Sequence, residues 1–198
     1  MKTMAEGGGG ASSRPGRRRA ADGRFAPARV RIGVLSDTHG RLDPVVLELF
    51  AGVDHIIHAG DVLHAEILEK LAELAPVTAV AGNLDHGALA KLPKEMTGEV
   101  GGVRFVVSHK PKRLLKRLAA GKVTVGEEGA PPDLVVWGHL HTPTAEWVEG
   151  TLLLNPGTAS SPDEEDDGPT VAIVEKMSTG LAVQFLPLER QPPFDSRS

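Results

Sequence analysis

Short apolar runs alternate with amphipathic stretches along the first half of the chain. Residues 30–36, 55–58 and 77–81 have the length and β-branched content of buried strands. Between them, residues 43–51 and about 65–75 carry apolar side chains at helical spacing. Regular alternation of strands and helices predicts an α/β fold with parallel strands.

The second half of the chain is predicted to be largely β. Residues 96–100 and 103–108 flank Gly101 and Gly102, a pair that suits the two-residue turn of a hairpin. The following segment, residues 111–120, has the spacing of a helix with Lys and Arg on its open face. Five further strands are expected at residues 134–137, 145–148, 152–154, 171–175 and 181–186.

Five of the predicted strands end in side chains that can bind metal ions. These side chains are Asp37 and His39, Asp61, Asn83 and Asp85, His109, and His139 and His141. Ligands of open α/β sheets bind beyond the carboxyl ends of the strands, so these residues are expected to share one rim. Such a group is costly to desolvate without metal, and a pair of divalent ions offsets that cost.

His139 and His141 are the most suggestive pair in this set. They follow an apolar run and Gly138, and in extended backbone residues two apart point the same way. Both imidazoles can then face one ion or two adjacent ions. The competing interpretation is a surface loop that happens to carry two histidines.

Composition limits the class of protein and the class of metal. The chain has 198 residues, of which 40% are apolar, which predicts a single globular domain over residues 29–190. No run approaches the ~20 apolar residues of a membrane span, so no membrane association is expected. Without Cys, any metal must be held by His, Asp, Glu or Asn, which favours hard or borderline ions.

The two ends of the chain lack hydrophobic periodicity. Residues 1–28 carry six basic and two acidic residues and are predicted to be a disordered basic tail, with an organelle-targeting peptide as the alternative. Residues 191–198 are expected to be a frayed C-terminus. The five consecutive acids at residues 163–167 are interpreted as a solvated loop, because a calcium site spaces its ligands.

The order of the strand-end motifs resembles that of the calcineurin-like metallophosphoesterases, and in particular their small single-domain bacterial and archaeal phosphodiesterases. The resemblance covers residues 30–187 and rests on Asp-x-His at 37–39, Gly-Asp at 60–61, Gly-Asn-x-Asp at 82–85, His109, Gly-His-x-His at 138–141 and Asn-Pro-Gly-Thr at 155–158. It implies an α/β (α+β) fold, a four-layer αββα sandwich of mixed sheets, with the metal site at the carboxyl ends of the strands.

The resemblance also implies a ligand set for two divalent ions. Asp37, His39 and His141 would hold one ion, Asn83, His109 and His139 would hold the other, and Asp61 would bridge them. The implied enzyme is cytoplasmic and hydrolyses a small phosphodiester, or a phosphomonoester, by attack of a hydroxide held between the ions, with Asp61, Asn83 and His109 as its catalytic residues. We expect manganese, with Fe, Zn, Co, Ni and Mg as alternatives.

Three positions depart from the family pattern. Larger phosphatases have a His that can protonate the leaving group where this chain has Leu84, so His86, His64 or a metal-bound water are the candidates for that role. Small members of the family often have His-Gly-His where this chain has His109-Lys110-Pro111, so the second imidazole is absent. Lys110 either binds substrate phosphate, together with His86, or is a solvated residue before a helix. The family's Pro-Arg pair is Pro162-Asp163 here, so no substrate-facing arginine is assumed.

The remaining aromatic and imidazole side chains are expected to be structural. His55 and His58 lie at the two ends of one strand, where a buried imidazole usually bonds to backbone or supports a ligand. Trp137 and Trp147 are expected in the core, because large apolar rings in strand patterns usually pack inward.

Two other functions compete with the enzyme. A non-catalytic scaffold is one, because the retromer subunit of eukaryotes shares this small fold, but the complete ligand set favours catalysis. A nuclease is the other. Residues 29–198 carry 16 basic and 24 acidic residues, which disfavours stable nucleic-acid binding. The sequence leaves open whether the chain forms a homo-oligomer.

Overall fold

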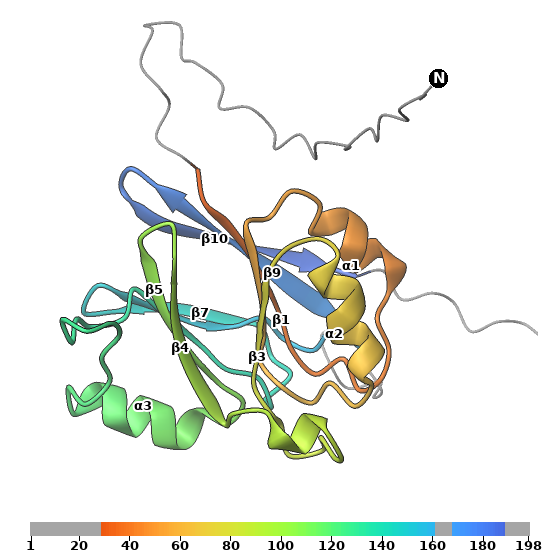
Figure 1. The fold of residues 1–198 in the computed structure, drawn as a ribbon. Helices are drawn as coiled ribbons and strands as arrows, with labels where there is room; N and C mark the ends of the chain where they lie inside the picture. The colour runs from red at the N-terminus through yellow and green to blue at the C-terminus, as the bar shows by residue number, and fades with distance from the viewer. Residues whose placement is uncertain (1–28, 161–167, 189–198) are drawn as a thin grey trace, which may run out of the picture.

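The computed structural model describes residues 29–160 and 168–188 (Figure 1). The predicted basic tail, the acidic run and the C-terminal residues 191–198 lie outside these described residues. Within the described part of the chain, no helix is both long and apolar enough to cross a membrane.

Two five-stranded mixed sheets form the centre of the molecule. The first has the order β10-β9-β1-β2-β3, in which β1, β2 and β3 are parallel and β9 and β10 are antiparallel to their neighbours. Its strands are β1 (Arg31–Leu35), β2 (His55–His58), β3 (Val77–Ala79), β9 (Thr170–Met177) and β10 (Gly180–Pro187). The parallel half of this sheet is the α/β unit predicted from the first half of the sequence.

The second sheet has the order β4-β5-β6-β8-β7, with β5, β6 and β8 parallel and an antiparallel strand at each edge. Its strands are β4 (Glu95–Val100), β5 (Val103–Ser108), β6 (Leu134–Val136), β7 (Thr144–Val148) and β8 (Thr151–Asn155). The predicted hairpin joins β4 to β5. Gly101 and Gly102 at its turn have φ of 54° and 76°, which glycine adopts without steric cost.

Helices cover the outer face of each sheet. The described helices are α1 (Pro44–Leu49), α2 (Ala65–Ala72), the 3₁₀ turn η1 (Leu89–Lys91) and α3 (Pro111–Ala119). Three hydrophobic clusters separate the layers that Figure 1 shows: one lies between the sheets, one under α1 and α2, and one under α3. This arrangement confirms the predicted four-layer αββα sandwich.

Strand β1 shows how the sequence builds these layers. Its alternate residues Ile32 and Val34 enter the cluster between the sheets, whereas Leu35 joins the cluster under α1 and α2. Gly33 faces α1, and a Cβ at this position would lie 2.8 Å from the ring of Phe50. Both faces of a parallel strand must be covered, and here the missing side chain lets the helix approach closely.

One core prediction is wrong. Trp137 is buried under α3, as expected, but Trp147 is 51% exposed. All five residues of β7 are exposed, and this strand lies at the edge of its sheet. A period-two pattern does not distinguish an edge strand from a central one.

Candidate metal centre

The backbone bends sharply where the predicted ligands lie. Five of them have positive φ: Asp37 at 54°, His39 at 46°, Asp61 at 53°, His139 at 70° and His141 at 57°. Non-glycine residues seldom adopt this region, and such strain concentrates at functional sites. The bends follow the carboxyl ends of β1, β2 and β6, and they turn side chains from both sheets toward one place.

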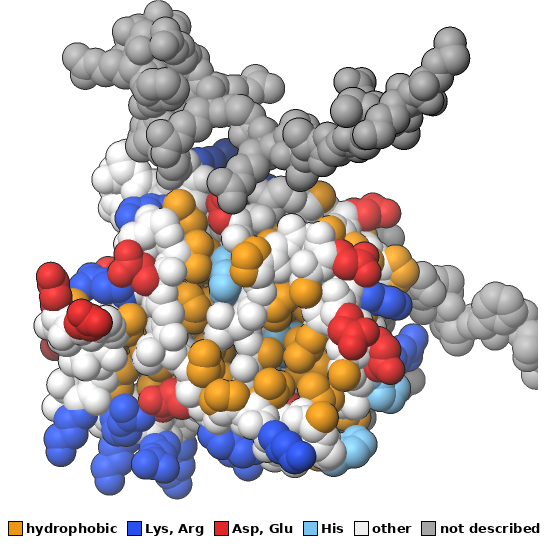
Figure 2. Space-filling model, in the orientation of Figure 1, with side chains coloured by type: hydrophobic (Ala, Val, Ile, Leu, Met, Phe, Trp, Pro, Cys, Tyr) orange, Lys and Arg blue, Asp and Glu red, His pale blue; other side chains and the backbone are white. Residues whose placement is uncertain are grey.

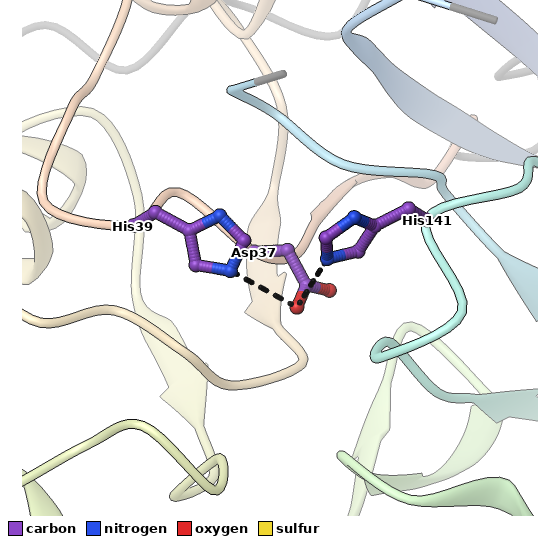
Figure 3. A group of neighbouring side chains, drawn as sticks. All are labelled: Asp37, His39 and His141. Carbon is purple, nitrogen blue, oxygen red and sulfur yellow. Dashed lines mark ion pairs between the residues drawn. The ribbon is translucent and has the colours of Figure 1, made fainter. Parts of the chain in front are cut away.

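Asp37 is the centre of one group of side chains (Figure 3). Its carboxylate is fully buried, and its Oδ1 lies 3.4 Å from His141 Nε2 and 3.7 Å from His39 Nε2. Its Oδ2 accepts a hydrogen bond of 3.0 Å from the backbone N–H of His139. Oδ1 itself has no hydrogen-bond partner among the described residues, which is unusual for a buried carboxylate oxygen.

Asp61 is the centre of a second group. Its Oδ2 lies 3.3 Å from His109 Nε2 and 3.9 Å from His39 Nε2, so it faces imidazoles of both groups. Its Oδ1 accepts a hydrogen bond of 2.7 Å from the N–H of Leu84. Asn83 Oδ1 is 3.1 Å from His109 Nε2. The ring of His139 completes the group, with its centroid 5.2 Å from that of His109.

The described side chains fit divalent metal ions. Two sets offer ligand atoms within 4.8 Å of one another: Asp37, His39 and His141, and Asp37, Asp61 and His109. His109 Nδ1–H donates to the carbonyl oxygen of Ala59 at 2.8 Å, which directs Nε2 at the site, where Nε2 donates to Asp61 while protonated and can bind an ion once it gives up its proton. Carboxylate and imidazole donors suit Mn, Fe, Zn, Co or Ni, and Asp37 Oδ1, which accepts no hydrogen bond from the described residues, can bind such an ion.

Electrostatics within the group favours ionised carboxylates. Burial raises the pKa of Asp61, but hydrogen bonds from His109 and from the Leu84 N–H outweigh burial and hold the pKa below its usual value. Burial likewise raises the pKa of Asp37, whose pKa is lowered overall by His141, Ser36 and the neighbouring positive charge. Ionised carboxylates are the form that binds cations.

Asp85 does not belong with the metal-facing side chains, although it was placed on the predicted rim. Its carboxylate accepts hydrogen bonds from four backbone N–H groups: Gly82 and Val62 at 2.8 Å, Leu63 at 2.9 Å and Asp61 at 3.1 Å. These bonds tie the loop after β2 to the loop after β3. Asp85 therefore fixes the backbone on which Asp61 and Asn83 stand.

His58 links the loop after β1 to the loop after β2. Its Nδ1 accepts the N–H of Gly60 at 3.2 Å, so its Nε2–H donates to Thr38 Oγ1 at 3.1 Å. Burial lowers the pKa of His58 to about 4, which keeps the imidazole neutral. His55 is farther away: it contacts Thr78 Oγ1 at 2.9 Å. Both positions agree with the structural roles expected for them.

The Asn-Pro-Gly-Thr motif holds the loop of Asp37 from the other side. Thr158 Oγ1 donates to the carbonyl oxygen of Asp37 at 2.9 Å, and Ser160 Oγ donates to that of Thr38 at 2.8 Å. Asn155 Oδ1 accepts the N–H of Gly157 at 3.0 Å and shapes the turn. The sequence motif pointed to this segment, but only the structure reveals its contact with Asp37.

An open cavity of about 460 Å³ lies over the group. It is lined by His39, Asp61, Leu63, Asn83, Leu84, His139 and His141. Asp37 and His109 are buried. The predicted ligands are thus brought together at one place, and five of them line the cavity, although Asp61 is itself 2% exposed.

The other candidate residues lie outside this cavity. His86 is exposed, with Nδ1 3.3 Å from the carbonyl oxygen of Leu84, and His64 lines a separate cavity of about 370 Å³ beside α2. Lys110 is exposed at the N-cap of α3. Burial lowers the pKa of His139, and the nearby charges of His109 and Lys110 lower it further, so Lys110 is near the site.

The sequence matches a family model over residues 30–179, most of the described domain, and that model is the calcineurin-like phosphoesterase superfamily domain. The chain belongs to this superfamily. Its curated relatives include a probable metallophosphoesterase of Methanocaldococcus jannaschii, 37% identical over 142 residues that cover 66% of this chain and 69% of the relative. A phosphodiesterase of the same archaeon is 26% identical, over 65% of this chain and 83% of its own.

Two solved structures show the same fold. A conserved uncharacterised protein of Streptococcus pneumoniae, described as a predicted phosphoesterase, superposes with a TM-score of 0.63 at 28% identity and covers 82% of this chain and 91% of its own. Vacuolar protein sorting 29 of Cryptosporidium parvum superposes with a TM-score of 0.61 at 18% identity. The match covers 82% of this chain and 99% of that protein. The second likeness shows the fold alone. Membership of this superfamily supports a hydrolase activity and implies divalent metal ions.

Proposed function

We propose that the protein is a dinuclear metal-dependent phosphodiesterase that hydrolyses a small phosphodiester in the cytoplasm. The observation that carries this proposal is the position of Asp61 Oδ2, which faces His109 at 3.3 Å and His39 at 3.9 Å. One carboxylate oxygen between two groups of imidazoles is the arrangement that a pair of ions needs. The name of the archaeal phosphodiesterase relative supports the same activity.

The ligand assignment follows the two groups. Asp37, His39 and His141 hold one ion, in keeping with the contacts of Asp37 Oδ1 at 3.4 and 3.7 Å. Asn83, His109 and His139 hold the other, since Asn83 Oδ1 and the ring of His139 both lie beside His109. Asp61 bridges, because its Oδ2 faces both groups. Manganese is the ion we expect, with Fe, Zn, Co, Ni and Mg as alternatives.

Two divalent ions at this site would supply a water-derived nucleophile at neutral pH and stabilise charge on the phosphoryl oxygens. The protein's own groups prepare that step. Asp37 and Asp61 stay ionised, and the contact of His109 Nδ1 with the Ala59 carbonyl directs Nε2 at the site. The open cavity admits the ester directly above these groups.

A diester suits the cavity better than a monoester does. Among the described residues, no Lys or Arg lines it, so the second negative charge of a monoester finds no side-chain cation there. We assign Lys110 to the approach of the phosphate and His86 to substrate binding or protonation of the leaving group. Both side chains are exposed and outside the cavity lining, so either must extend toward the ester to act.

The charge distribution bears on the size of the substrate. Lys and Arg side chains gather over α3, where Lys112, Arg113 and Lys116 are exposed, whereas the rest of the visible face carries both signs (Figure 2). This basic surface is short and has no aromatic residue within α3 on which bases could stack. We therefore propose a small substrate rather than nucleic acid.

Reconstitution of the metal-stripped protein tests this function. Each divalent ion is added in turn, and turnover is measured with bis(p-nitrophenyl) phosphate and with p-nitrophenyl phosphate. We expect activity to return with manganese and the diester to have the higher kcat/KM. Equal or greater activity on the monoester would refute the diester assignment, and bound ions without turnover of either ester would favour the scaffold function instead.

A further inference from the structure

Two leucines form one wall of the metal cavity. Leu63 and Leu84 line the same space as His39, Asp61 and His139. Leu84 is 52% exposed, although it lies next to the predicted ligand Asn83. Exposure of an apolar side chain to water is unfavourable. Packing against an apolar part of a ligand would remove this apolar surface from water.

Leu63 has a strained backbone conformation in this wall. Its φ is 66°, a conformation that a bulky γ-branched residue seldom adopts. The carboxylate of Asp85 fixes this conformation by accepting the N–H groups of Leu63 at 2.9 Å and Val62 at 2.8 Å. Strain of this kind persists only where surrounding contacts impose it, and it is common at ligand-binding positions.

Leu84 is held in the wall by a different contact. Its N–H donates to Asp61 Oδ1 at 2.7 Å, so the position of its side chain is coupled to the carboxylate that faces both groups of imidazoles. The two leucines therefore lie at a fixed place relative to the phosphate site. Whatever group they touch must be attached to the phosphorus atom or close to it.

We propose that Leu63 and Leu84 form a subsite for an apolar, preferably aromatic, substituent of the phosphoester. This inference rests on the proposed function for the identity of the ligand as an ester. Among the described residues, the lining offers that substituent no Lys or Arg, so a second phosphate or carboxylate is disfavoured at this place. The substrate class is then a phosphodiester with one flat, uncharged organic group next to the scissile phosphate.

A pair of phosphonates separates this subsite from the metal chemistry. Phenylphosphonate and methylphosphonate present the same anionic head to the ions when both dissociation constants are expressed for the dianion, and they then differ only in the apolar substituent. Calorimetric titration of the manganese-loaded full chain with each compound gives two dissociation constants. Their ratio isolates the contribution of the wall, because contacts of the shared head cancel.

We expect the wild type to bind phenylphosphonate about tenfold more tightly than methylphosphonate, from apolar area covered by the ring. Leu84→Ala should reduce this preference about threefold or more, with bound manganese unchanged, and Leu84→Met should retain it. Leu74→Ala, at an exposed leucine that does not line the cavity, is the matched control and should bind both compounds as the wild type does.

A wild type that binds the two phosphonates equally would overturn the subsite, as would a Leu84→Ala variant with the full preference for the phenyl compound. These outcomes are independent of turnover. If the protein prefers phenylphosphonate through Leu84 but hydrolyses no diester, the subsite stands and the proposed phosphodiesterase activity fails.

Discussion

Two hydrogen bonds and the backbone conformation position Asp61 and leave one carboxylate oxygen for the metal site. Its N–H donates to Asp85, and its Oδ1 accepts the N–H of Leu84. Its φ of 53° turns the side chain toward the imidazoles. Oδ2 consequently faces His39 and His109. Among the described ion pairs, Asp61 Oδ2 is the only side-chain oxygen that lies near an imidazole of each proposed ligand set. Asp61 should therefore be the hardest ligand to replace.

Asp61→Asn should lower both metal content and turnover more than His39→Ala does. The amide keeps the shape of Asp61 but removes the full negative charge that offsets two adjacent cations, whereas water can occupy the place of a lost imidazole. We expect turnover of Asp61→Asn to be roughly tenfold or more below that of His39→Ala, with incomplete recovery at high manganese. Metal analysis and diester hydrolysis on both variants check this order, and the reverse order would contradict it.

Lys110→Ala should change substrate affinity without changing metal content. An ammonium group has no lone pair with which to ligate a cation, but the charge of Lys110 acts on His139 and can attract an approaching phosphate. We expect KM for the diester to rise roughly two- to fivefold at low salt, with kcat nearly constant. Lys112→Ala, exposed on the same helix, is the control. Loss of bound metal in Lys110→Ala would assign this residue a different role.

His58 should make the metal-stripped protein sensitive to mild acid. Burial lowers the pKa of His58 to about 4, below its ordinary value of 6.5, so the unfolded chain binds this proton first as the pH falls. Stability is therefore complete above pH ~6.5 and declines between about pH 6.5 and 4, by about 3 kcal/mol in total.

His58→Gln removes this titration and tests it. At neutral pH we expect the variant to be less stable by about 1–3 kcal/mol, because it loses the bonds to Gly60 and Thr38. The difference should narrow by about 2 kcal/mol near pH 5. Urea denaturation at both pH values measures it, with His86→Gln at an exposed position as the control. A constant difference would show that His58 does not titrate in this range.

The sequence predicted which side chains meet, but not how each is used. His39, Asp61, Asn83, His139 and His141 all line the cavity, as their places after strands implied. Asp85 occupies an equivalent place in the sequence and yet turns away to bind four N–H groups. A sequence motif gives residue types and spacing, whereas the direction of a carboxylate depends on loop conformations that only the folded chain defines.

The strands and helices lie close to their predicted ranges. Burial of one or two faces of an element fixes the spacing of its apolar residues, and this spacing can be read from the sequence. Differences occur where tertiary position matters. Helix α2 ends at Ala72, and β3 ends at Ala79, although Val80 and Ala81 continue as buried chain. Trp147 fits a strand pattern but lies on an edge strand. Local pattern identifies the element and not its neighbours.

The Arg104–Asp133 pair links two elements of the second sheet and should give a pH-dependent contribution to stability. Asp133 receives hydrogen bonds from Arg104 Nη2 at 2.7 Å and from Nε and the backbone N–H at 2.9 Å. The hydrogen bonds from Arg104 hold the pKa of Asp133 below its usual value, in spite of partial burial. The pair thus joins the strand β5 to the residue that precedes β6.

Asp133→Asn should lower the melting temperature at neutral pH but not in strong acid. A carboxylate with a lowered pKa stabilises the fold above its unfolded pKa of about 3.9, and this contribution is lost as the pH falls through the lower folded value. The gap in melting temperature between wild type and variant should therefore narrow once the pH falls below the unfolded pKa and close in strong acid. Glu69→Gln, exposed on α2, is the control. A gap that persists at low pH would assign the effect to packing.

The whole molecule places the site where the two sheets meet. Strands β1, β2 and β3 deliver Asp37, His39, Asp61 and Asn83 from one sheet, whereas β5 and β6 deliver His109, His139 and His141 from the other. Alternation along the chain predicted the parallel core of the first sheet. It could not predict that β9 returns beside β1 or that β8 pairs with β6, because such contacts join segments far apart in sequence. The family resemblance implied the four layers of the sandwich but no strand order.

Crystals of the manganese-loaded protein, measured at the manganese absorption edge, test the central claim most directly. Anomalous scattering locates each ion independently of any assignment of ligands. We predict two peaks about 3.5–4 Å apart over the carboxyl ends of the strands, with the Asp61 carboxylate between them. A single peak, or two peaks of which only one contacts Asp61, would contradict the bridged dinuclear site.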